Sequence, residues 1–81
     1  MGERVKTEQW NEQAVRSMDE LGKLVREVRK GQEMTQEEVS GLAGLGNRFM
    51  IDLERGKETM QMQKVIDVLR LLGLELVIRK A

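Results

Sequence analysis

Two short helical patterns lie one tight turn apart in the middle of the sequence. The first begins with a capping box at Thr35, in which the Thr35 hydroxyl accepts the amide hydrogen of Glu38 and the Glu38 carboxylate reaches back. Gly44-Leu45-Gly46 interrupts this helix after about two turns. A second helix follows at once, capped by Gly46 or Asn47, and Gly56 ends it. The sequence therefore predicts two neighbouring helices with only a tight turn between them.

A longer helix precedes this pair and another follows it. Apolar residues recur at three- and four-residue spacing from Met18 to Lys30, behind a Ser17 capping box, and we expect Gly31 to end this helix in the left-handed conformation. The following helix is expected to begin at a Thr59 cap and to end before Gly73. Its wide apolar stripe consists of Met62, Val65, Ile66, Leu69 and Leu72. The whole pattern predicts an all-α bundle of four helices.

Residues 74–79 are typical of a β-strand because they are rich in branched apolar side chains. One strand cannot stand alone, and the sequence holds no second strand of comparable quality, so the simplest ladder partner is the same strand of another copy. The preceding helix also carries more apolar surface than one small core can cover, at Val68 and Leu71. We therefore expect a homodimer joined by an intermolecular sheet. The expected dimerisation residues are Val68, Leu71, Leu74, Leu76, Val77 and Ile78.

The composition narrows the chemistry that the chain can perform. It contains no His and no Cys, which excludes a Ser-His-Asp triad, a thiolate nucleophile, a disulfide framework and a His/Cys zinc site. We therefore expect no enzymatic activity, no metal and no cofactor. No run approaches the roughly 18 apolar residues of a membrane span, and no secretory signal is present, so a cytoplasmic protein is expected. Because 14 Lys+Arg balance 14 Asp+Glu, any nucleic-acid contact requires a local basic patch.

Two helices joined by a short Gly-containing turn are typical of a helix-turn-helix, which lays its second helix in the major groove of DNA. The sequence also resembles the Cro/repressor-like (XRE) helix-turn-helix family over roughly residues 18–73. Three runs carry the resemblance: Met34-Thr35-Gln36-Glu37-Glu38-Val39, Leu42-Ala43-Gly44-Leu45 and Met50-Ile51-Asp52-Leu53-Glu54-Arg55-Gly56-Lys57.

The end of the chain is similar to the HipB-type antitoxin branch of that family. A fourth helix leads through Leu72-Gly73-Leu74-Glu75-Leu76 into a terminal strand. The resemblance implies a lambda-repressor-like bundle, dimers that share an intermolecular sheet, and association with a toxin kinase. It also implies that Arg29 pairs with Glu54 in a structural salt bridge.

The second helix of the motif supplies the candidate contacts to double-stranded DNA. Arg48 suits the O6 and N7 atoms of guanine, Asn47 suits an adenine edge and Ile51 suits a thymine methyl group. Asp52 is expected to accept from a cytosine amine or to contact nothing. The candidate phosphate contacts are Gln36, Arg55 and Lys57.

The sequence therefore predicts three segments: an N-terminal arm at residues 1–16, a DNA-binding domain at 17–73 and a dimerisation strand at 74–81. The expected function is a dimeric, sequence-specific repressor that binds a palindromic operator and acts as the antitoxin of a HipBA-like toxin-antitoxin system, autoregulating its operon. The alternative, suggested by the zero net charge, is a protein-interaction module with little or no DNA binding.

Overall fold

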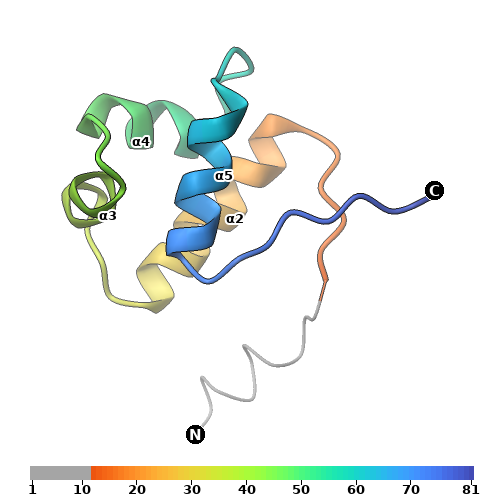
Figure 1. The fold of residues 1–81 in the computed structure, drawn as a ribbon, viewed down its shortest axis with the longest axis horizontal. Helices are drawn as coiled ribbons and strands as arrows, with labels where there is room; N and C mark the ends of the chain where they lie inside the picture. Colours follow the sequence, from red (N-terminus) through yellow and green to blue (C-terminus); the bar gives the residue numbers. More distant parts are fainter. Residues whose placement is uncertain (1–11) are drawn as a thin grey trace, which may run out of the picture.

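The computed structural model describes residues 12–81, so most of the predicted arm lies outside the described residues. Within this range the chain forms four helices, labelled in Figure 1. They are α2 (Met18–Gly31), α3 (Gln36–Ala43), α4 (Asn47–Glu54) and α5 (Met62–Leu71). In the described range, every helix falls short of the length and apolar content that a membrane span requires. The all-α part of the predicted fold is confirmed.

Helices α3 and α4 each pack against two other helices. Helix α4 contacts α3 on one side and α2 on another, and α5 packs against α3 to complete the bundle (Figure 1). All the helices contribute to a single core, whose buried apolar residues are Val25, Val39, Met50, Leu53, Val65, Val68, Leu69 and Leu72. The two motif helices are therefore held at a fixed mutual angle by side chains rather than by the turn alone.

Helix α2 begins as predicted but ends differently. The Ser17 hydroxyl accepts the amide hydrogen of Glu20, but the Glu20 carboxylate accepts from the amide of Arg16 instead of completing a capping box on Ser17. Gly31 remains helical, and the left-handed residue is Glu33, with φ of 59°. The prediction for Gly31 was wrong because the helix continues through it to a C-cap at Gln32, which moves the chain reversal to Glu33.

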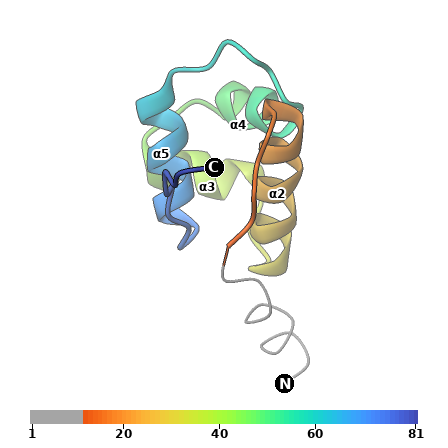
Figure 2. The same ribbon diagram turned by 90° about the vertical axis from the view of Figure 1, so that its right-hand side faces the viewer.

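The start of α5 also differs from the prediction. The helix begins at Met62 behind an extended Gln61, so Thr59 is not its cap. Met60 packs against the core, and residues 57–61 form the long connection across the top of the molecule in Figure 2. Thr59 is of a residue type that often caps helices, but the partly buried Met60 packs against the core and the chain stays extended through Gln61.

Val68 was wrongly assigned to a dimer surface. It is fully buried in the core of its own chain, because α5 packs along the stripe Val65, Val68, Leu69 and Leu72. Leu71 remains exposed at the edge of that stripe. Beyond α5, residues 74–81 form no strand in the single chain; Leu74 packs against the core, and the tail then leaves the bundle (Figure 1). Arg79 forms an ion pair with Glu12, so the tail passes close to the segment that leads into α2.

Gly22 allows α2 to approach the end of α4 closely. A Cβ atom at this position would overlap the carbonyl oxygen of Leu53 and would lie 2.8 Å from that of Glu54. Both obstacles are backbone atoms, which cannot move aside as a flexible side chain can.

We expect Gly22→Ala to lower the free energy of unfolding by about 1–3 kcal/mol or more, because the added methyl group overpacks the contact between α2 and α4. Gly41→Ala is the matched control: Gly41 is helical and nothing lies within 4 Å of its added Cβ, so this change should stabilise by about 0.5–1 kcal/mol. Urea denaturation of both variants provides the measurement. Equal effects of the two substitutions would contradict the close approach at Gly22.

Candidate nucleic-acid interface

Helices α3 and α4 form a helix-turn-helix whose turn is closed by backbone hydrogen bonds. The Thr35 capping box is present in both directions, with the Thr35 hydroxyl 3.0 Å from the Glu38 amide nitrogen and the Glu38 carboxylate 2.8 Å from the Thr35 amide nitrogen. Gly44 caps the end of α3 in the left-handed conformation, with φ of 71°. The amide of Leu45 then donates to the Ser40 carbonyl oxygen at 2.8 Å. Gly46 is the N-cap of α4, so the turn leads directly into the next helix.

Helix α4 has one buried face and one polar face. Met50 and Leu53 are fully buried. Arg48 points away from them, and 73% of its side chain is exposed. Ile51 and Asp52 are partly exposed one turn further along. Of the predicted base-contacting residues, Arg48 is therefore exposed on α4, whereas Ile51 and Asp52 are half-buried beside it.

Asn47, the first residue of α4, is half-buried. Its side-chain oxygen Oδ1 is buried and accepts no hydrogen bond from the described residues. Such an acceptor is costly, at about 1–3 kcal/mol. Turning this side chain outward would therefore sacrifice no hydrogen bond at Oδ1.

Asp52 pairs with two of the predicted DNA-contacting cations. Its Oδ1 lies 3.2 Å from Nε of Arg48, and its Oδ2 lies 3.6 Å from Nζ of Lys57. The Asp52 side chain is only 18% exposed, whereas that of Lys57 is 52% exposed. Both carboxylate oxygens are thus engaged within the chain. Arg55, the other predicted phosphate contact after α4, is exposed.

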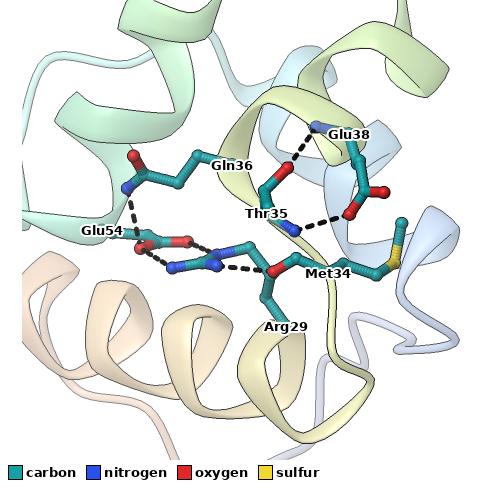
Figure 3. A network of polar contacts seen from close by, with 6 residues as sticks. All are labelled: Arg29, Met34, Thr35, Gln36, Glu38 and Glu54. Atoms are coloured by element: carbon teal, nitrogen blue, oxygen red, sulfur yellow. Dashed lines mark hydrogen bonds and ion pairs between the residues drawn. The ribbon is translucent and has the colours of Figure 1, made fainter.

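The Arg29–Glu54 pair joins α2 to the end of α4 (Figure 3). Nε of Arg29 lies 2.6 Å from Oε2 of Glu54, and its Nη2 lies 3.0 Å from Oε1. Nη1 donates to the carbonyl oxygen of Met34 at 2.7 Å, which ties the connection before α3 into the same network. The side chains of Arg29 and Glu54 are only 9% and 4% exposed, so this is a buried, bidentate ion pair.

Gln36 also belongs to this network. Its Nε2 donates to Oε1 of Glu54 at 3.0 Å, so the side chain links the first turn of α3 to the last residue of α4 (Figure 3).

The hydrogen bond that Arg29 donates to Glu54 raises the pKa of Arg29 above its ordinary value, against the opposing effect of burial. Because the pKa of Arg29 is raised in the folded state, its contribution to stability is fully present below the ordinary pKa of arginine. This contribution is lost only as the pH rises through the still higher pKa of the folded state. Arg29 therefore stays charged at any pH of ordinary use.

A comparison with known proteins identifies the family. The uncharacterized HTH-type transcriptional regulator y4mF of Sinorhizobium fredii is 49% identical to this chain over 59 residues, which cover 73% of this chain and 78% of y4mF. The chain belongs to the HTH-type transcriptional regulators. No family model matches it.

The fold of this HTH-type regulator is that of HipB. A HipB chain from a HipB-O4 20mer complex superimposes with a TM-score of 0.79, covering 86% of this chain and 99% of HipB at 20% identity. A second match, from a HipA-HipB-O2-O3 complex, has a TM-score of 0.78 at 19% identity and covers 85% of this chain and 97% of the matched chain. These likenesses establish the shared four-helix fold.

Several contacts of the regulator were not predicted from the sequence, among them the Arg48–Asp52 ion pair and the hydrogen bond between Gln36 and Glu54. The spacing of Arg48 and Asp52, four residues apart on one helix, is a signal that favours their pairing. The bond between Gln36 and Glu54 joins residues 18 positions apart and carries no such local signal.

Proposed function

We propose that this HTH-type regulator is a dimeric, sequence-specific DNA-binding repressor, and the antitoxin of a HipBA-like toxin-antitoxin system that autoregulates its operon. The observation that carries the proposal is the exposure of Arg48 on α4, opposite the buried Met50 and Leu53, in a fold that it shares with HipB from a HipB-O4 20mer complex. In this arrangement the second helix of the motif presents its polar face to a major groove.

The proposed base contacts start at the amino end of α4. Arg48 donates from its two terminal nitrogens to guanine O6 and N7, and Ile51 contacts a thymine methyl group. Asn47 turns toward an adenine edge, a movement that breaks no hydrogen bond at its Oδ1.

The proposed phosphate contacts surround this helix. Arg55 and Lys57 follow α4 directly and supply the cations. Gln36 lies at the amino end of α3, where the helix dipole favours an anion. Because its side-chain amide already binds Glu54, its contribution at a phosphate comes chiefly from the backbone amide.

The C-terminal tail is the proposed dimerisation element. Leu76, Val77 and Ile78 are 45%, 59% and 93% exposed, which is unusual for three consecutive apolar residues. Pairing of the tail with that of a second copy would bury these side chains and would satisfy the backbone groups of the strand. Leu71 adds exposed apolar surface on the adjoining end of α5.

Removing residues 76–81 is expected to convert the dimer into a monomer. The cut leaves Leu74 in place, and Leu74 packs against the core of its own chain, so the bundle should remain folded. Sedimentation analysis gives the mass, and circular dichroism checks the helices. A truncated chain that sediments as the same dimer would exclude the tail as the dimerisation element.

The antitoxin part of the proposal rests on the HipA-HipB-O2-O3 complex, in which the structurally similar chain occurs with HipA. A toxin kinase encoded beside this regulator is the proposed protein partner. Co-expression of the two neighbouring genes should yield one complex that purifies together and should suppress the growth defect caused by the toxin alone. If the protein encoded by the neighbouring gene does not bind the regulator, the antitoxin part of the proposal is wrong.

Selection from a pool of random duplexes tests the DNA-binding function. We expect the regulator to enrich a palindrome whose half-sites lie about 34 Å apart, which places two recognition helices in successive major grooves. If no sequence is enriched while the regulator still binds its protein partner, the protein-interaction module becomes the better account.

A further inference from the structure

Asp52 is the only acidic residue among the four base-contacting candidates on α4, and both its oxygens face cations. We infer that Asp52 determines specificity indirectly: its carboxylate orients Arg48 for guanine and weakens binding to unmatched DNA. It does this without contacting a base itself. The inference rests on the proposed DNA-binding function and assigns a different role to a residue first considered as a partner of cytosine.

The geometry favours orientation of Arg48. The Asp52 carboxylate forms an ion pair with Arg48 on the Nε side of the guanidinium, with Oδ1 3.2 Å from Nε. A guanidinium has five N–H donors in a fixed plane, so a carboxylate on this side leaves the donors on both terminal nitrogens available. Two such donors are what a bidentate contact to guanine O6 and N7 requires. Because Arg48 is otherwise 73% exposed, the ion pair also reduces the rotamer freedom that the side chain loses on binding.

The burial of Asp52 argues against a direct base contact. Its side chain is 18% exposed, whereas the two cations that it holds extend much further into solvent. The more exposed cations therefore meet the DNA first, with the carboxylate behind them.

The same carboxylate opposes non-specific binding. Affinity for unmatched DNA comes almost entirely from cations at phosphates. Asp52 offsets part of the positive charge of Arg48 and Lys57. Its ion pairs also restrict the movement of both side chains toward a phosphate. On matched DNA the guanine contact of Arg48 compensates for the weaker attraction to phosphates, whereas unmatched DNA offers no such contact.

Asp52→Asn keeps the shape of the side chain and removes its charge. We expect this variant to bind a scrambled duplex about threefold more tightly per subunit, and so about tenfold per dimer, because each exposed pair contributes modestly. Affinity for the matched duplex should change by less, so the ratio of the two affinities falls. The salt dependence on scrambled DNA should steepen by about one phosphate contact per subunit.

The experiment titrates the full-length protein against two labelled duplexes at several salt concentrations. One duplex is the sequence enriched by the wild-type protein, and the other is its scrambled counterpart. Asp67→Asn is the matched control, since Asp67 is an exposed aspartate on α5 whose carboxylate accepts from Gln63. Thermal unfolding confirms that each variant is folded. The double variant Asp52→Asn/Arg48→Ala tests whether Asp52 acts through Arg48.

The inference is supported if Asp52→Asn loses discrimination, Asp67→Asn does not, and the loss largely disappears in the Arg48→Ala background. It is overturned if Asp52→Asn weakens only the matched duplex, which would show a direct base contact. It is also overturned if the two Asp→Asn variants behave alike, which would show a general effect of net charge. Wild-type protein that binds neither duplex would instead overturn the proposed function, and this inference with it.

Discussion

Arg29→Met is expected to lower the free energy of unfolding by about 3–5 kcal/mol, one of the largest effects of any single substitution in this protein. The change leaves the Glu54 carboxylate, which is 4% exposed, buried without its cation. It also leaves the carbonyl oxygen of Met34 without its donor. Glu54→Gln should have a similar effect, because it leaves Arg29 as an uncompensated buried charge.

A double-mutant cycle measures the interaction energy between Arg29 and Glu54 apart from their other contacts. Arg29→Met combined with Glu54→Gln should cost much less than the sum of the single changes, because neither member is then left as an unpaired buried charge. The exposed pair Asp19–Lys23 provides the control and should couple by less than about 1 kcal/mol. Additive losses at positions 29 and 54 in urea denaturation would mean that the buried pair does not act as a unit.

Arg48→Ala and Lys57→Ala are expected to impair DNA binding in different ways. Loss of Arg48 should cost about 1–3 kcal/mol at each half-site of the matched duplex and should relax preference at one symmetric pair of positions. Loss of Lys57 should weaken all duplexes alike and reduce the salt slope by about one per subunit, because a phosphate carries no sequence information.

Titrations of both variants against matched and scrambled duplexes distinguish these effects. Ile66→Val is a suitable reference variant for folding, since Ile66 is partly buried and lies on α5, outside the two helices of the motif. If Arg48→Ala binds the matched duplex as the wild type does but loses its protein partner, α4 is a protein-binding surface.

The features predicted correctly from sequence are those that local chemistry determines. The Thr35 capping box and the left-handed Gly44 depend on residues within a few positions of each other, and both are present. The exception is the Arg29–Glu54 pair, which joins residues 25 positions apart and was expected from the family resemblance; it is also present. At the start of α5 the prediction fails: Thr59 is a good cap by residue type, but Met60 packs against the core and the helix begins only at Met62.

The face of α5 that enters the core could not be chosen from sequence. Apolar residues surround much of this helix, so periodicity alone allowed either Ile66 or Val68 to lie in the centre of the stripe. Packing against α3 places Val68 fully inside and leaves Ile66 partly exposed. The site shows the same limit: nothing in the sequence indicates the hydrogen bond that the fold makes between the Gln36 side-chain amide and Glu54.

The salt dependence of duplex binding by the wild-type dimer tests the central claim most directly. With Arg55 and Lys57 from each subunit at phosphates, the logarithm of the association constant should fall linearly against that of the salt concentration, with a slope of about −0.9 for each phosphate contacted. The matched palindrome should bind at least about 10³-fold more tightly than its scrambled counterpart at physiological salt. Equal, weak binding of both duplexes at every salt concentration would contradict a sequence-specific DNA-binding function.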